Sequence, residues 1–582
     1  MASRKLLAAF ALGTILIFSG TATDTSAKQP VRGGTLNYVV GSKIPSLDLH
    51  RETTFGVVHP VRPYYSVLMR VNPDNPQSTT DFVCDICTGG IPKPTNGSKT
   101  YTFKIRRDAK FHNDFKAGGK SINDKEFNTK LLGDKVTASD VKKVLGSTLN
   151  AYDVAYNFQL IIFPPKGVPS ARKAFFRMVE SVEATDKDTV VFKLKFPSGA
   201  FLPAVALPFN AIYPKALLEK DPNFFTKNIY GSGPFMFDEY QPGSFVKGIR
   251  NPTYHHVGSD GKQLPYLDGV RSISAPKMAI RLNAIRGDRA AIEFRGFPPK
   301  ARDDLKKALG DKITVQESNW NCALMFIGNH KHKFFGKPKV RRALSLAVDR
   351  WGGSNYLSKI AIVKTVGGIV FPGDPLAATE EELVKIPGFH KDLKKSRAQA
   401  RKLLKEAGVP DGYTFKFNNR GVDQPYKIVG TWLVGQWKKI GLNPKQSVQP
   451  SGPFYASLRK KKDYDVSIDF NCQSVINPLA DVSKYISDDL AGNNYANYQD
   501  READKIYDAM LREADPVKVR KLMRKYEWHT LAKEAHVGPT PWWYKINPHR
   551  SYVQNWKVAP SHYLNQSLEQ IWCTGGKCSH SN

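Results

Sequence analysis

Apolar and polar positions follow two different periods along this chain. Between residues 101 and 105 every second residue is apolar, which is the pattern of a β-strand with one buried face. Between residues 338 and 350 the apolar residues recur every three or four positions, as on the buried face of an α-helix, and Pro338 suits the first turn. Both patterns occur throughout the chain, without an obvious repeat. The sequence therefore predicts an α/β protein.

The same rules predict further elements. Helices are expected over residues 392–407, 425–440 and 501–535. The last of these is interrupted at Asp515-Pro516, because proline cannot continue a helix. A strand is expected over residues 32–40, and a hairpin of two strands over residues 182–192.

The middle of the chain contains a dense series of turn signals, beginning with YGSGPFMF at residues 230–237. We expect Gly231 and Gly233 to adopt turn geometry with positive φ, and Pro234 to fix φ where the chain enters a strand. Gly243 interrupts that strand, so a second strand should follow it. No nucleophile or set of metal ligands lies here, and we interpret this stretch as scaffold.

The N-terminus predicts export from the cytoplasm. Arg4 and Lys5 precede an apolar run over residues 6–18, and residues 25–27 offer a small-residue cleavage site. The run is too short to span a bilayer, so we expect a signal peptide that is cleaved near Ala27. Because the first cysteine is Cys84, a lipid anchor at the cleavage point is not expected, and the predicted location is the periplasm.

Length and charge narrow the class of protein. A chain of 582 residues exceeds one hydrophobic core, so two or three domains are expected. The formal charge of +33 could favour anionic ligands, envelope polymers or nucleic acid. Export and the scattered positions of the basic residues argue against nucleic acid, and a solvated basic surface is the simplest interpretation.

Six cysteines in an exported chain suggest disulfides. Cys84 and Cys87 form a CxxC motif that could be redox-active, but no thioredoxin-like βαβ pattern surrounds it, and a local bridge is favoured. Cys573 and Cys578 flank a turn that is compatible with another local bridge. Cys322 and Cys472 remain, and the alternative of a zinc site built from the CxxC motif and this pair has no support from ligand spacing.

Enzyme motifs are absent from the sequence. It contains no GxSxG, HExxH or GxxxxGK[ST] motif and no EF-hand loop. The pairs His255-His256 and His330/His332 could bind a metal, but exposed loop histidines are the more common explanation. Asp463 and Asp465 have no companion base. We therefore predict a protein with no catalytic residues, no metal and no cofactor.

Several motifs in a fixed order carry a resemblance to a known family. They are residues 33–36, 230–237, 250–254 (RNPTY), 264–270 (LPYLDGV), 339–344, 403–408, 437–441 and 504–541. In this order and spacing the chain resembles the extracytoplasmic solute-binding proteins of ABC importers, and among them the peptide/nickel/oligopeptide-binding family, family 5. Such an order over ~500 residues is hard to produce by chance.

The resemblance implies a two-lobed periplasmic-binding-protein fold, type II-like and large, with an extra subdomain in lobe one. The chain should cross between the lobes near residues 270–277 and return near residues 537–543. This divides it into a signal peptide (1–27), lobe one (28–275 and 538–582) and lobe two (276–537). In the family, a strand like that at residues 101–105 leads directly into a helix. Two segments of this chain, residues 137–141 and 150–154, are candidates for the start of that helix. Residues 113–135 therefore look like an insertion.

The resemblance also implies a ligand-binding cleft between the lobes. The positions that it assigns to ligand contact are Thr54, Phe55, Phe294, Arg295, Trp320, Arg459, Asn471 and Ser474. For the aromatic residues, packing inside a lobe is the alternative, and for the arginines an internal salt bridge. Relatives carry cysteines at positions 322 and 472, so a Cys322–Cys472 disulfide beside the cleft is implied.

The departures from the family pattern bear on the ligand. Peptide binders place an aspartate where this chain has Ser474, so a ligand's α-ammonium would lack its counter-ion, unless Asp469 supplies one from a shifted place. Arg295 stands where relatives have a neutral residue, and guanidinium groups suit carboxylates or phosphates. Peptides remain the default substrate class, with an anionic small molecule or sugar conjugate as the competing class.

We predict that the protein captures such a ligand and delivers it to an ABC permease with its ATPase subunits. The protein is expected to be a monomer and to bind no nucleic acid. The alternatives are a secreted hydrolase acting on envelope material and a basic protein that binds envelope polymers.

Overall fold

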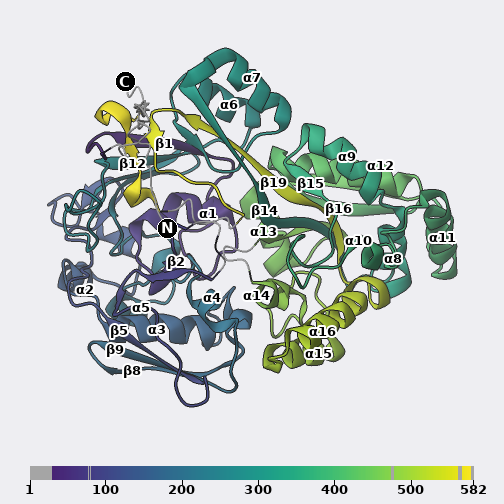
Figure 1. Ribbon diagram of the computed structural model, residues 1–582, viewed down its shortest axis with the longest axis horizontal. Coiled ribbons are helices and arrows are strands. Elements are labelled where there is room, and N and C mark those ends of the chain that lie inside the picture. Colours follow the sequence, from purple (N-terminus) through teal and green to yellow (C-terminus); the bar gives the residue numbers. More distant parts are fainter. Residues whose placement is uncertain (1–28, 76–77, 79, 473–476, 561–566, 579–582) are drawn as a thin grey trace, which may run out of the picture.

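A single mixed β-sheet runs through the whole molecule. The computed structural model describes residues 29–75, 78, 80–472, 477–560 and 567–578 (Figure 1). Within these residues, eleven strands form one sheet in the order β10-β11-β12-β1-β13-β19-β14-β18-β16-β17, and β15 pairs with β19. The strands are β1 Thr35–Val40, β10 Phe235–Gln241, β11 Phe245–Arg250, β12 Gly269–Ser274, β13 Ile292–Glu293, β14 Ile313–Gly328, β15 Val363–Thr365, β16 Thr414–Arg420, β17 Asn443–Gln449, β18 Val466–Cys472 and β19 Gly538–Arg550.

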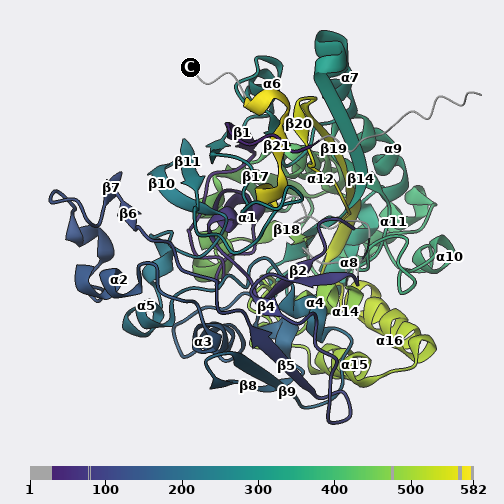
Figure 2. The same cartoon turned by 60° about the vertical axis from the view of Figure 1, so that its left-hand side comes forward.

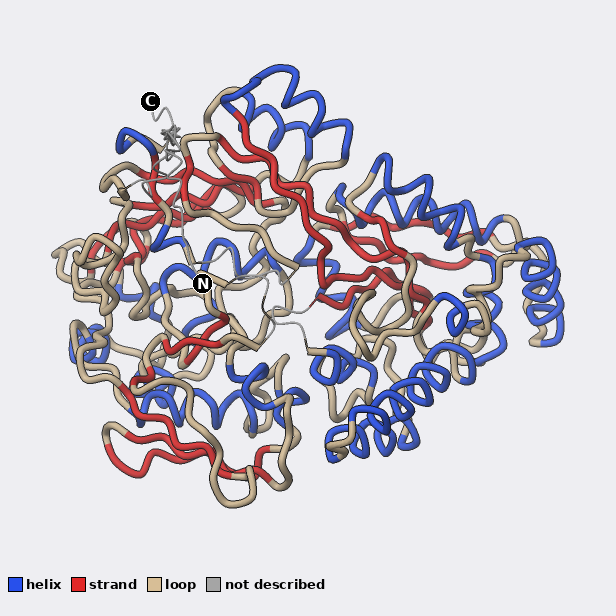
Figure 3. The backbone as a smooth tube through the Cα atoms, in the orientation of Figure 1, coloured by secondary structure: helices blue, strands red, loops and turns tan. Residues whose placement is uncertain are grey.

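The two ends of this sheet belong to two lobes. Lobe one, on the left of Figure 1, contains β1 to β12 and the C-terminal strands β20 (Val553–Gln554) and β21 (Trp572–Cys573). It also carries a separate sheet in the order β4-β5-β9-β8. Its strands are β4 Cys87–Thr88, β5 Thr100–Ile105, β8 Val179–Asp186 and β9 Thr189–Leu194. Lobe two, on the right, contains β14 to β18 and the helices around them, and Figure 3 shows helices covering the outside of its strands.

The predicted helices are present. Residues 392–407 form α11, with Asp392 as its N-cap, and the stretch after Arg501 is broken into α15 and α16 at Pro516. Both competing helix starts begin a helix, since Thr137 and Asn150 each form a capping box. The helices are α1 Phe55–Val61, α2 Ala138–Val144, α3 Ala151–Ile162, α4 Phe201–Val205, α5 Lys215–Lys220, α6 Met278–Arg286, α7 Pro299–Leu309, α8 Pro338–Ala347, α9 Arg350–Ile360, α10 Glu380–Leu383, α11 Leu393–Glu406, α12 Ile428–Lys438, α13 Ser451–Ala456, α14 Pro478–Val482, α15 Arg501–Arg512 and α16 Pro516–Trp528.

Strands β14 and β19 join the two lobes. They pair antiparallel from Ile313 opposite Arg550 down to Phe326 opposite Gly538, and Figure 2 shows them as two long neighbouring strands. Helices α6 and α7 pack against β1 through a small apolar cluster that includes Val39, Ile285 and Leu305. Because one sheet is continuous through both lobes, the boundaries at 275/276 and 537/538 stay predictions.

The YGSGPFMF stretch is scaffold in lobe one, but its glycines act differently from our expectation. Gly231 and Gly233 do not have positive φ, whereas Gly243, between β10 and β11, does, with φ of 76°. A Cβ on Gly233 would lie 2.4 Å from the backbone of Tyr64 and Tyr65. These glycines are therefore required by close packing of two backbone segments and not by turn geometry.

Residues 113–135, the predicted insertion, cover the edge of lobe one. They include the short strands β6 (Lys116–Ala117) and β7 (Lys120–Ser121), and most of their side chains are exposed. Phe115, Ala117, Ile122 and Leu132 are buried, and Phe115 packs against Phe224 and Tyr230. Whether relatives lack this segment stays a prediction.

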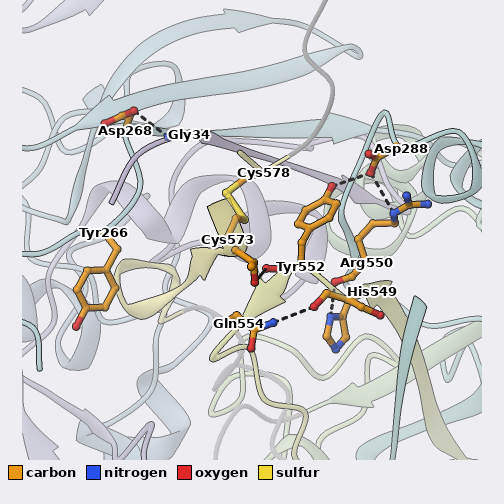
Figure 4. The surroundings of a disulfide bond; sticks show 12 residues. Gly34, Tyr266, Asp268, Asp288, His549, Arg550, Tyr552, Gln554, Cys573 and Cys578 are labelled. Atoms are coloured by element: carbon orange, nitrogen blue, oxygen red, sulfur yellow. Dashed lines mark hydrogen bonds and ion pairs between the residues drawn. A yellow bond between two sulfur atoms is a disulfide. The ribbon is translucent and has the colours of Figure 1, made fainter. Parts of the chain in front are cut away.

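Three disulfides bind the described cysteines in the pairs that we expected. Cys84 bonds with Cys87, Cys322 with Cys472, and Cys573 with Cys578. The Cys573–Cys578 bridge lies beside Gly34 (Figure 4), where a Cβ would lie only 3.4 Å from the sulfur of Cys578. The C-terminal segment is thereby held against the chain just before β1.

Candidate ligand-binding site

A buried guanidinium lies where the two lobes meet. Arg420 ends β16 in lobe two and is 1% exposed. It donates to Ser42 Oγ at 2.8 Å and to Thr54 Oγ1 at 3.1 Å, both in lobe one. Its Nε donates to Ser451 Oγ at 2.9 Å. All of these partners are neutral hydroxyl groups, and Arg420 forms no ion pair with a carboxylate of the described residues.

Arg295 is a second buried guanidinium in the same region. It follows β13 and donates to the carbonyl of Gln424 at 3.2 Å, while its Nε has no hydrogen-bond partner. Both arginines lie near Tyr426, whose ring centre is 5.8 Å from the guanidinium of Arg295 and 5.0 Å from that of Arg420. Burial, followed by the charge of Arg420, lowers the pKa of Arg295 to about 10. No carboxylate of the described residues forms an ion pair with it.

Arg350 is a buried arginine with a structural role, and it differs from Arg295 in its hydrogen bonds. It is equally buried, but it donates to the carbonyls of Pro539, Ser345 and Gly388 at 2.8, 3.0 and 2.5 Å. Those bonds compensate much of the loss of hydration. Arg295 lacks such a set, so its charge remains available to another group.

Arg459 has an internal partner across the lobes. It lies 3.3 Å from Glu52 and donates to Thr53 Oγ1 at 3.2 Å. Tyr495, which like Arg459 belongs to lobe two, also contacts Thr53, and their hydroxyl oxygens lie 3.2 Å apart. These contacts, like those of Arg420, join the lobes in a closed arrangement. A ligand contact by Arg459 stays a prediction, and the salt bridge that we named as its alternative is present.

Asp469, which we considered as the counter-ion for a peptide's α-ammonium group, already forms an ion pair within the protein. Asp469 is buried on β18 and lies 3.0 Å from Lys484 Nζ. Asn471, two residues further, donates to the carbonyl of Asp481 at 3.0 Å. Asn471 lines a small cavity between the lobes, together with Thr53, Arg172, Phe470, Cys472, Lys484, Asn493 and Tyr495. Ser474 lies outside the described residues.

Aromatic rings form one wall of this region. Phe55 stacks on Trp320 at 5.7 Å, and Trp320 meets Trp543 edge-on at 5.0 Å. Phe294 is enclosed by Tyr38, His59 and Trp556 and has no exposed surface. Phe55, Phe294 and Trp320 are therefore core residues in the closed arrangement, and their contact with a ligand stays a prediction.

Sequence reasoning missed Arg420 and its partners Ser42 and Ser451. The strand that ends at Arg420 was not predicted, and neither serine stands in a motif. The only local signal was the alternation in TFKFNNR before Gly421, which is typical of a strand that ends at a turn.

The histidine pairs are less exposed than we expected. His255 is buried and His256 lies 2.9 Å from Asp85, so the interpretation as exposed loop histidines is wrong for this pair. His330 and His332 are half-buried. Asp85 also accepts from the backbone N–H of Val67 and lies 3.6 Å from Arg62, which makes this cluster part of an ion-pair network.

Comparison with known proteins identifies the family. The model of the bacterial extracellular solute-binding proteins, family 5, matches residues 90–489, which is more than half of the chain. The chain belongs to this family. Family 5 proteins are substrate-binding components of ABC importers, and they are transport proteins and not enzymes.

Relatives and solved structures agree with this assignment. The oligopeptide-binding protein AppA of Bacillus subtilis is 27% identical over 475 residues, covering 77% of this chain and 82% of AppA. The DppA protein of Helicobacter pylori, solved with the peptide STSA, has a TM-score of 0.75 at 20% identity and covers 93% of this chain and 98% of DppA. AgaA from A. tumefaciens R10, solved with agropinic acid, has a TM-score of 0.76 at 19% identity and covers 93% of this chain and 99% of AgaA.

These likenesses establish the two-lobed fold. Members of family 5 act outside the cytoplasm. Among the described residues, no helix combines the length and the hydrophobicity needed to cross a lipid bilayer.

Proposed function

We propose that this chain captures a solute carrying at least one carboxylate in the cleft between its lobes and delivers it to an ABC permease. The observation that carries this proposal is the pair Arg295 and Arg420. Both guanidiniums are buried, both lie against Tyr426, and neither forms an ion pair among the described residues. A carboxylate would supply the missing counter-charge through charge-assisted hydrogen bonds.

The charge balance of the cleft favours an acid over a peptide with a free N-terminus. Glu52 is paired with Arg459, and Asp469 with Lys484. Neither of these two acids is left to hold an ammonium group, whose burial without a partner is costly, and the nearby buried Asp481 accepts a hydrogen bond from Asn321. The peptide and agropinic acid bound to DppA and AgaA both fall within the size of ligand that this fold accepts. An opine-like or other acidic conjugate fits this cleft better than an ordinary peptide.

The proposal extends to the state of the mature protein. It would begin after a cleavage near Ala27, carry no lipid anchor, act as a periplasmic monomer without binding nucleic acid, and perform no chemistry on its cargo. Thr54 and Asn471 would contribute polar contacts, while Phe55, Phe294 and Trp320 would shape the apolar wall. Release would depend on the transporter, because the closed lobes enclose the solute.

Mass spectrometry of small molecules released by denaturing the purified protein tests the ligand class directly. We expect an acidic compound, and its affinity should fall more than tenfold, or ~1.4 kcal/mol, in Arg295→Ala and in Arg420→Gln. Calorimetric titration of the compound into each variant measures this. Arg107→Ala is the matched control, because it removes the same charge from a side chain that is 83% exposed. Recovery of ordinary peptides that both variants bind as tightly as the wild type would refute the proposal.

A further inference from the structure

A group of metal-ligating side chains lies in lobe two, outside the cleft. Asp500 is the N-cap of α15, and its Oδ1 accepts from the backbone N–H groups of Glu502 and Ala503. Its other oxygen, Oδ2, is 2.6 Å from Nε2 of His529 and 2.7 Å from Nε2 of His536. One carboxylate oxygen thus faces two imidazole nitrogens, and one ligand atom from each residue lies within 4.8 Å of the others.

We propose that Asp500, His529 and His536 form a binding site for a divalent transition metal, with Zn(II) as the best fit. Two imidazoles and one carboxylate are a common set of three protein ligands for zinc, with water in the fourth position. At zinc–ligand distances of about 2.0–2.1 Å, tetrahedral ligand atoms lie about 3.3 Å apart. The side chains would therefore spread by about 0.6 Å to admit the ion. The proton on each Nε2 would move to Nδ1 of the same ring.

The surroundings hold these side chains in place. His529 is 7% exposed and His536 is 4% exposed, so both rings are fixed by packing. Tyr498 stacks on His536 with ring centres 3.7 Å apart.

Unsatisfied nitrogen atoms give an independent indication. Nδ1 of His536 and Nε2 of the neighbouring His330 are both buried without a hydrogen-bond partner. The ring centres of His330 and His536 lie 5.0 Å apart. Nδ1 of His536 would carry the ring proton once Nε2 binds the ion, whereas the water on the ion would give the buried Nε2 of His330 a partner.

The charges around the site set a limit on affinity. Arg341 donates to the carbonyls of Glu534 and Ala535, next to His536, and its charge opposes a cation there. The second histidine cluster is less suitable. Asp85 faces Arg62, and the guanidinium of Arg106 donates to the carbonyl of His255. We therefore assign the metal to Asp500, and the Asp85 cluster serves as a control.

Titration of Zn(II) into the chelator-treated mature chain, with any affinity tag removed, tests the assignment. All described cysteines are in disulfides, so thiols do not compete. We expect one ion per chain, visible d–d absorption with Co(II) in place of Zn(II), and at least tenfold weaker binding in His529→Ala and His536→Gln. His256→Ala should bind like the wild type.

Two results would overturn the assignment. The first is a wild-type protein that takes up no stoichiometric Zn(II) and gives no Co(II) spectrum, a readout that does not depend on any variant folding. The second is binding that survives in both His529→Ala and His536→Gln, or that is lost in His256→Ala. Circular dichroism of each variant confirms that it is folded. The outcome is independent of the cleft and its solute.

Discussion

At the scale of single residues, the packing around Gly233 in lobe one leaves little room for substitution. Its carbonyl accepts from Nε2 of His112 at 3.1 Å and from the side chain of Asn251 at 2.8 Å. On its other side the backbone of Tyr64 and Tyr65 leaves no space for a side chain. A glycine, an imidazole and an amide thus hold three distant parts of the chain together.

Gly233→Ala should destabilise the protein strongly. The added Cβ would lie 2.4 Å from backbone atoms, which cannot move aside without shifting the chain. We expect a loss of about 3 kcal/mol or more in the free energy of unfolding, measured with urea. Gly435→Ala is the control, since this position in α12 has open space, and alanine there should add about 0.5–1 kcal/mol. Equal stability of the two variants would contradict the packing argument.

His112 should make the protein sensitive to acid. Burial lowers its pKa to about 4 in the folded state, while its ordinary value of about 6.5 applies when the chain is unfolded. Below pH 6.5 the unfolded chain binds the extra proton, so stability is complete above that pH and is lost as pH falls towards 4. The slope is about 1.4 kcal/mol per pH unit at most.

His112→Gln keeps a donor near Gly233 but cannot titrate. Its unfolding free energy should therefore change less between pH 6.5 and 4 than that of the wild type, whatever its absolute stability. Urea titrations across this range measure the difference. Parallel pH profiles for the two proteins would show that His112 does not titrate in this way.

The site could be predicted only in part at this scale. Arg295 and Arg459 were found through the resemblance, which assigns both positions to ligand contact. Arg420 has no motif, and its role depends on Ser42 and Thr54, which are 378 and 366 residues away in the chain. Glu52, the partner of Arg459, is also distant, at 407 residues, so no local pattern could reveal that this charge is neutralised.

At the scale of elements, β14 and β18 form the strongest link within lobe two. They pair from Cys322 opposite Cys472 to Gly328 opposite Val466, and the disulfide closes the end of this ladder. The helices were predicted well because their apolar periodicity is local. The length of β14 and its place between β18 and β19 were not predicted, since strand pairing depends on residues that are far apart in sequence.

Removal of the Cys322–Cys472 bridge should cost more stability than removal of Cys573–Cys578. The cysteines are separated by 150 residues in the first bridge and by 5 in the second. The chain-entropy relation gives about 5 kcal/mol for the longer loop and about 2 kcal/mol for the shorter one. Denaturant unfolding of the two double Cys→Ser variants measures both losses. A larger loss from the terminal bridge would contradict this order.

At the scale of the whole molecule, polar side chains from both lobes meet between them, beside the aromatic contact of Phe55 with Trp320. Arg420 with Ser42 and Thr54, and Arg459 with Glu52, connect segments that lie on opposite lobes. The lobes are also joined by the paired strands β14 and β19. Closure is therefore stabilised by side chains that separate when the lobes open.

Glu52→Gln should shift the equilibrium towards the open form. It removes the charge that pairs with Arg459, so the solute's affinity should fall about tenfold, or ~1.4 kcal/mol. Small-angle X-ray scattering with and without solute follows the closure, and calorimetry follows the affinity. Glu126→Gln is the control, because Glu126 pairs with Lys120 on the surface and is 78% exposed. Unchanged affinity in Glu52→Gln would mean that this pair does not stabilise closure.

The two buried guanidiniums near Tyr426 bear on ATP use by the importer. A binding protein that closed when empty would engage the transporter and promote hydrolysis of ATP without transport. Arg295 packs against Gly41, just after β1 in lobe one, whereas Arg420 ends β16 in lobe two. Repulsion between them would therefore raise the free energy of the empty closed form, and a carboxylate would remove that repulsion. The residues that select the solute would thus also limit ATP hydrolysis by the importer while no solute is bound.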